Sequence, residues 1–102
     1  MSEKEKLYIS PNICAWHDED DLMYRIDIEM PGADKDSIVL KMHEDSYFVK
    51  GESEDTIYIG SYLVCCEVQP EKAKAIYKNG LLKVEVPFKE APKLQTIEVT
   101  IE

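Results

Sequence analysis

The dipeptide Asn79-Gly80 is the feature that most constrains how this chain folds. Asn and Gly tolerate the positive φ angles that a two-residue hairpin turn demands. Beyond the turn, the apolar residues Leu82, Val84 and Val86 alternate with charged residues or proline, which is the period of a half-buried strand. Residues 75–87 therefore predict two antiparallel strands joined by a tight turn.

The same two-residue period recurs along the chain. Apolar residues occupy every second position in 22–30, in 38–42 and in 47–49, and residues 56–66 are rich in β-branched and aromatic side chains. Residues 97–101 alternate again, so we expect a last strand or a strand-like tail there. Six to eight short strands separated by turn signals predict an all-β, antiparallel β-sandwich.

Composition limits the partners and the number of domains. The chain has 102 residues, enough for one domain, and its 21 acidic and 12 basic side chains give a net charge of -9. That charge disfavours nucleic acid and anionic membrane surfaces as partners. With three cysteines and no apolar leader at the start, we expect a cytoplasmic protein. We divide the chain into a short polar tail (1–7), a sandwich domain (8–90) and a C-terminal tail (91–102).

Four segments, taken in order, resemble the α-crystallin domain of small heat-shock proteins. They are a strand ending in Met30-Pro31-Gly32, the strand from Ser37 to Met42, the segment Val49-Lys-Gly-Glu52, and residues 70–80. The last leads into Ala75-x-x-x-x-Gly80-x-Leu82, which matches the family signature A-x-x-x-x-G-x-L. The resemblance covers roughly residues 12–102 and implies an immunoglobulin-like sandwich of the α-crystallin type that binds proteins.

One connection is shorter than in this family. Relatives carry a long loop after the x-G-E segment, with a strand that pairs with a partner subunit. Here only Ser53-Glu-Asp55 separates Glu52 from the next strand, and three residues span at most about 11 Å. Because little sequence precedes the first strand as well, we expect a monomer or small dimer and not a large cage.

The resemblance implies a groove that accepts extended apolar segments. Its side chains belong to the strands at 38–42 and 73–77 and are Ile38, Leu40, Met42, Ala75 and Tyr77. The C-terminal Ile97-x-Val99-x-Ile101 resembles the tail with which relatives fill such a groove by strand addition. Docking of this tail on its own chain and on a neighbouring chain remain equal alternatives.

A second candidate surface lies on the strand at 56–66. Ile57, Ile59 and Leu63 fall on one side of this strand, and Tyr58 and Tyr62 fall on the other. One face of a sandwich strand is normally polar, so a strand that is apolar on both faces predicts a further contact. That contact is either a tail or loop of the same chain, or a subunit or client.

We predict neither an enzyme nor a metal site. The chain contains no phosphate-binding glycine motif and no H-E-x-x-H, and two histidines offer little acid-base chemistry. Zinc-type ligands are present in Cys14, His17, His43 and the pair Cys65-Cys66, but neighbours at these spacings on a strand point to opposite faces and converge only where a turn intervenes. We expect no cofactor, and we expect Trp16 to anchor the core.

The function that follows is that of an ATP-independent chaperone, a holdase that binds apolar segments of partly unfolded proteins. The alternatives are a co-chaperone or adaptor resembling CS-domain proteins, which binds one folded partner, and a subunit that modifies assemblies of longer small heat-shock proteins.

Overall fold

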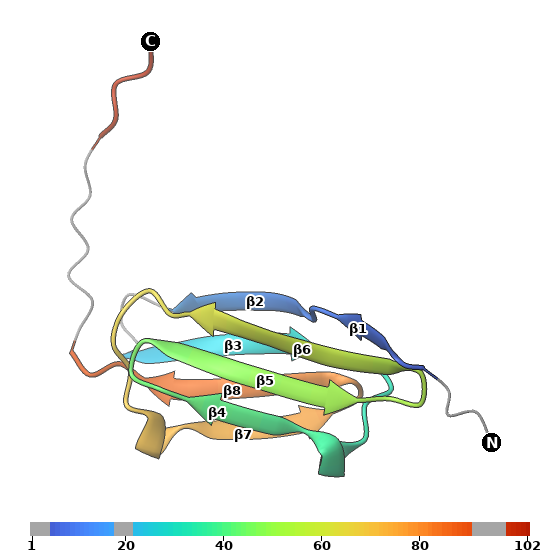
Figure 1. Cartoon of the computed structure of the whole chain (residues 1–102). Helices are drawn as coiled ribbons and strands as arrows, with labels where there is room; N and C mark the ends of the chain where they lie inside the picture. The colour runs from blue at the N-terminus through green and yellow to red at the C-terminus, as the bar shows by residue number, and fades with distance from the viewer. Residues whose placement is uncertain (1–4, 18–21, 91–97) are drawn as a thin grey trace.

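The computed structural model describes residues 5–17, 22–90 and 98–102. Within these ranges two four-stranded sheets face each other, which confirms the predicted all-β sandwich (Figure 1). The strands are β1 (Leu7–Ile9), β2 (Asn12–His17), β3 (Met23–Glu29), β4 (Val39–Met42), β5 (Ser46–Glu52), β6 (Thr56–Leu63), β7 (Lys74–Lys78) and β8 (Leu81–Pro87). Two short 3-10 turns, η1 (Lys35–Ser37) and η2 (Pro70–Lys72), lead into β4 and β7.

The strand order leaves the sandwich with two long sides of different character. One sheet has the order β1-β6-β5-β4 and the other has the order β2-β3-β8-β7. Strands β1 and β2 therefore border one long side, and β4 and β7 border the opposite side (Figure 1). The pairing of β1 with β6 is parallel, whereas the other described strand pairs are antiparallel.

The core lies between the sheets and uses the alternating residues. Tyr24, Ile26 and Ile28 of β3 are buried opposite Val86, Val84 and Leu82 of β8. The facing sheet contributes Tyr47 and Val49 of β5 and Tyr58 of β6. Each fully buried aliphatic side chain contributes about 1.5–3 kcal/mol of transfer free energy, so this alternation is the main source of stability.

The Asn79-Gly80 turn has the predicted conformation. Their φ angles are 53° and 79°, and the turn joins β7 to β8. Gly80 also lies against Pro31, because a Cβ at this position would be 3.0 Å from the Pro31 Cα. The Met30 amide donates to the Gly80 carbonyl at 2.8 Å. The hairpin is therefore held against the loop that follows β3.

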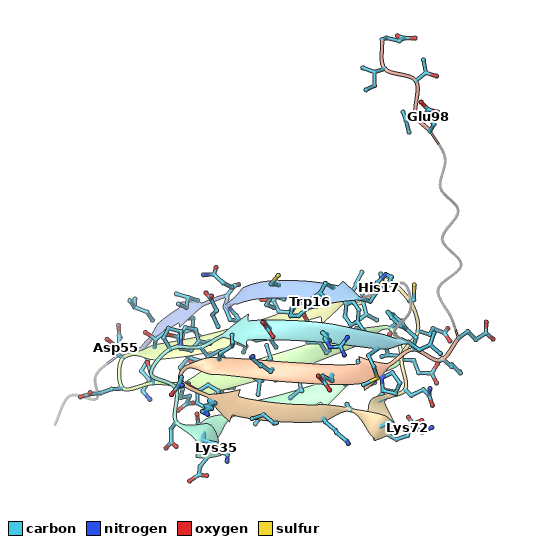
Figure 2. The ribbon with its side chains drawn as sticks, turned by 180° about the vertical axis from the view of Figure 1, so that it is seen from behind. Trp16, His17, Lys35, Asp55, Lys72 and Glu98 are labelled. Atoms are coloured by element: carbon cyan, nitrogen blue, oxygen red, sulfur yellow. The ribbon has the colours of Figure 1, made fainter. Side chains whose placement is uncertain are left out.

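Trp16 does not anchor the core, so that expectation is wrong. It lies opposite Arg25 on β3, between two pairs that face the interior, and its side chain is 40% exposed. Trp16 and His17 lie at the end of β2, along one edge of the molecule (Figure 2). The direction of Trp16 is therefore set by the register of β2 with β3.

The described part of the C-terminal tail, residues 98–102, forms no strand. Val99 is 76% exposed and Ile101 is 93% exposed. Ile97 lies outside the described residues. The predicted last strand is therefore not part of either sheet.

Candidate functional site

The predicted groove residues lie on the two strands that border the β4/β7 side. Leu40 and Met42 on β4 are opposite the buried Val49 and Tyr47 of β5, so both side chains point into the sandwich. Ile38, which precedes β4, also packs against the core. These three side chains are half-buried, and no described strand pairs with the outer edge of β4.

Strand β7 contributes the residues on the other sheet. Ala75 and Tyr77 lie opposite Val84 and Leu82, two core residues of β8, so they also face inward. Tyr77 is half-buried and packs against the core, whereas Ala75 is exposed. The structure therefore places all five predicted groove residues on inward faces along one side of the sandwich.

One end of this side is fixed by tyrosines from both sheets. The Tyr77 hydroxyl donates to the carbonyls of Met30 at 2.8 Å and Ala33 at 3.0 Å. The Tyr58 hydroxyl, from the other sheet, donates to the Pro31 carbonyl at 2.7 Å. These bonds cross-link the sheets through the loop after β3 and hold Tyr77 in place near the end of β7.

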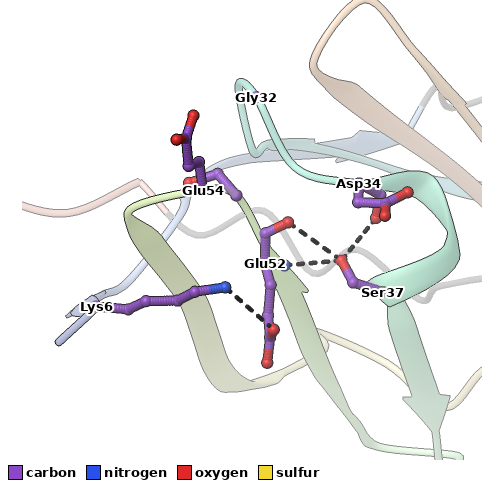
Figure 3. A pocket seen from close by; sticks show the side chains of 7 residues that line it. Lys6, Gly32, Asp34, Ser37, Glu52 and Glu54 are labelled. Carbon is purple, nitrogen blue, oxygen red and sulfur yellow. Dashed lines mark hydrogen bonds and ion pairs between the residues drawn. The ribbon is translucent and has the colours of Figure 1, made fainter. Parts of the chain in front are cut away.

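A polar hollow of about 260 Å³ lies beside the same loop (Figure 3). The Ser37 hydroxyl donates to the Asp34 carbonyl at 2.6 Å and accepts from the Glu52 amide at 2.9 Å. Lys6 forms an ion pair with Glu52 at 3.5 Å. The hydroxyl of Ser37 therefore attaches η1 to the end of β5 through backbone groups, and the ion pair attaches the residue before β1 to the same strand.

The predicted apolar face on β6 is covered unevenly. Ile57 is only 8% exposed because β1 lies alongside it, with Tyr8 opposite Ile57 in the register. Ile59 is half-buried, and Leu63 is 82% exposed. The same chain thus covers one end of this face and leaves the other end open.

Sequence reasoning missed β1. Leu7, Tyr8 and Ile9 are all exposed large hydrophobic residues, and they pair with the first three residues of β6. A run of three strand-forming residues was the available signal, but it lacks the alternation that marks a half-buried strand. Together with Leu63, these residues extend the apolar surface along the β1/β6 edge.

Lysines flank the open side of the sandwich. Lys74 and Lys78 are exposed on β7, and Lys41 is exposed on β4. Charged residues on an edge strand discourage uncontrolled pairing with other edges. In the described ranges, no three His, Cys, Asp or Glu side chains converge on a metal-sized site, and no helix is long and apolar enough to cross a membrane.

Comparison with known proteins agrees with this geometry. Residues 16–102 match the Hsp20/alpha crystallin family. Small heat shock protein C4 of Rickettsia felis is 26% identical over 98 residues, covering 80% of this chain and 60% of that protein. The chain therefore spans less than two thirds of this curated relative.

Solved structures show the same fold at lower identity. Heat shock protein 16.0 of Schizosaccharomyces pombe has a TM-score of 0.69 at 19% identity, over 92% of this chain and 99% of that chain. HSP18.5 of E. histolytica has a TM-score of 0.70 at 19% identity, over 89% and 99% respectively. These likenesses show the fold, and the family match over residues 16–102 shows that the chain belongs to the Hsp20/alpha crystallin family of small heat-shock proteins.

Proposed function

We propose that this chain is an ATP-independent holdase that binds apolar segments of partly unfolded proteins in the groove between β4 and β7. The observation that carries the proposal is the inward, partly exposed apolar row on two strands whose outer edges pair with no described strand. An extended segment pairs there through backbone hydrogen bonds and inserts alternate side chains between the sheets. The net charge of -9 keeps the loaded complex soluble.

Adjacent residues on β7 allow a controlled test. Ala75 and Ile76 are both exposed, but Ala75 faces the groove and Ile76 faces the opposite side of the sheet. The measurement is suppression of light scattering by a heat-denatured enzyme at substoichiometric chaperone. Ala75→Lys should abolish suppression, because it places a charge among apolar groups. Ile76→Lys should suppress as the wild type does, and both should keep the wild-type melting temperature.

Each result has a defined meaning. Equal suppression by Ala75→Lys and the wild type would exclude this groove as the client site. Absence of suppression by the wild type, together with tight binding to one folded protein, would replace the holdase by the adaptor.

As a second probe of the groove, a peptide of residues 96–102 should compete with the client. The same peptide with Ile97, Val99 and Ile101 replaced by Ser should not.

We also propose that the chain associates with itself through two of its surfaces. The open end of the β6 face, with Ile59 and Leu63, joins two copies into a small dimer, and Ile97 and Val99 of each copy dock in the groove of the other. Ile59→Lys should lower the mass measured by light scattering, and the double variant Ile97→Ser/Val99→Ser should lower it without changing the melting temperature. Unchanged mass in either variant removes that surface from the proposal. A lower melting temperature at constant mass in the double variant means that the tail docks on its own chain.

A further inference from the structure

Two adjacent cysteines occupy the bend that follows β6. Cys65 is exposed, and Cys66 is half-buried and packs against the core. The two thiols belong to consecutive residues of one bend, so few backbone bonds separate them. Cys14 is the third cysteine of the chain. It lies on β2 in the opposite sheet, where it is opposite Asp27 of β3 in the strand register. The two thiols of the bend are therefore a local pair.

The backbone holds this bend on both sides of the cysteines. Before them, the Val64 amide donates to the Asp45 carbonyl at 2.9 Å. After them, the Val68 amide donates to the Glu44 carbonyl at 2.8 Å, and the Lys89 amide donates to the Glu67 carbonyl at 2.9 Å. Val68 is fully buried and bridges to Phe88. The fold thus restricts the positions from which the two thiols project.

The pair is present as two free thiols. Adjacent Cα atoms are about 3.8 Å apart across a trans peptide, whereas disulfides usually join Cα atoms roughly 4.4–6.8 Å apart. A disulfide within the pair would therefore be strained. Burial, and then the hydrogen bond with the neighbouring Cys66 thiol, raises the pKa of Cys65. A protonated thiol reacts slowly with peroxides, which makes Cys65 a poor peroxide sensor.

The number of ligands favours one class of binding partner. Structural zinc takes four ligands, and the described residues bring together no group of three from His, Cys, Asp and Glu. An arsenic(III) centre that carries one organic substituent needs only two more bonds, and its pyramidal geometry holds two sulfur ligands close together. We propose that Cys65 and Cys66 form a dithiol site that binds a monosubstituted trivalent arsenical.

The reaction is a condensation without electron transfer. The arsenical, R–As(OH)₂, loses two As–O bonds, and the two thiols lose their S–H bonds. Two As–S bonds form, and the released hydroxyl groups and protons leave as two molecules of water. Arsenic stays trivalent, and the product is a ring that contains arsenic, both sulfur atoms and the backbone between the cysteines.

The first test uses the reduced full chain and phenylarsine oxide, which hydrates to the diol that reacts. We expect one equivalent to consume two of the three thiols and to give one arsenical per chain by intact mass. Cys14→Ser should bind as the wild type does. Cys65→Ser should bind more weakly by on the order of 10²-fold, because the second As–S bond is no longer intramolecular. Since Cys65 is exposed, this variant keeps the fold, which circular dichroism verifies.

Three results of that titration overturn the proposal. The first is wild-type affinity in Cys65→Ser. The second is an adduct in which one arsenic joins two chains. The third is loss of two thiols with a mass decrease of two hydrogens, which means oxidation and not binding.

The second test separates a site built by the fold from two thiols that are merely adjacent in sequence. The unfolded chain also carries both thiols, so the arsenical stabilises the protein only by its preference for the native bend. If the arsenical binds the native bend ten times more tightly than the unfolded chain, the melting temperature rises by roughly 5–10 °C for a domain of this size. An unchanged or lower melting temperature means that the fold does not build the site, and it overturns the proposal.

Discussion

The two long sides of the sandwich use apolar residues in opposite ways. On the β1/β2 side, Leu7, Tyr8 and Ile9 occupy an edge strand but are exposed, and they contribute little to the core. On the β4/β7 side, the edge strands direct Leu40, Met42 and Tyr77 into the space between the sheets. An edge strand can therefore cover a neighbouring strand without stabilising the domain, or it can stabilise the domain and remain open to another chain.

The largest expected difference between the two sides concerns two tyrosines. Tyr77→Ala removes a packed ring and two hydrogen bonds to loop carbonyls. It should lower the free energy of unfolding by about 3–5 kcal/mol, as large aromatic truncations do. Tyr8→Ala on the exposed β1 should change the free energy by less than about 0.5 kcal/mol. Urea unfolding measures the free energy of both variants. Equal losses of unfolding free energy in Tyr77→Ala and Tyr8→Ala would contradict the difference between the two sides.

A smaller effect is expected at alkaline pH. Burial raises the pKa of Tyr47 above its ordinary value of 10.0, and the nearby Tyr24 and Tyr62 raise it further. The folded state therefore keeps this proton where the unfolded chain loses it. The resulting stability is fully present below pH 10 and is lost above it, by about 1.4 kcal/mol per pH unit.

Tyr47→Phe removes this contribution from β5, the strand next to β4. Between about pH 8 and pH 11, the variant should therefore lose less unfolding free energy than the wild type. The exposed Tyr8→Phe should show the wild-type slope. A steeper loss of unfolding free energy with pH in Tyr47→Phe than in the wild type would mean that Tyr47 of the wild type ionises more readily in the folded protein than in the unfolded chain.

The smallest expected effect concerns the attachment of β1. The Lys6–Glu52 ion pair is 3.5 Å long, and both side chains are about one third exposed. Lys6→Ala should therefore cost only about 0.2–1 kcal/mol, and less in concentrated salt. Lys41→Ala on β4 is the matched control for loss of an exposed lysine. A cost comparable with that of Tyr77→Ala would show that β1 supports the fold.

Local patterns predicted most of the fold, whereas the groove residues were named from the family resemblance and stay a prediction. The turn at Asn79-Gly80 and the alternation in β3, β5 and β8 depend on residues close in sequence, so they could be recognised directly. The alternation in 38–42 likewise agrees with the inward position of Leu40 on β4.

Features that depend on distant partners were not predictable in this way. The exposure of Trp16 follows from the β2 register with β3, and the cover over Ile57 follows from parallel pairing with residues almost fifty positions away. The anchored bend at Cys65-Cys66 depends on carbonyls of Glu44 and Asp45.

The tyrosine bonds at the loop after β3 have a consequence for how the sandwich deforms. Tyr58 and Tyr77 link the sheets at one end, and the backbone bonds of the cysteine bend link them at the other end. Along the β1/β2 side, the chain itself passes from one sheet to the other through Ser10 and the buried Pro11. Separation of the sheets is therefore easiest midway along the β4/β7 side. For the proposed binding of extended segments, this predicts an adjustable width there, so that one domain accepts segments of different bulk without unfolding.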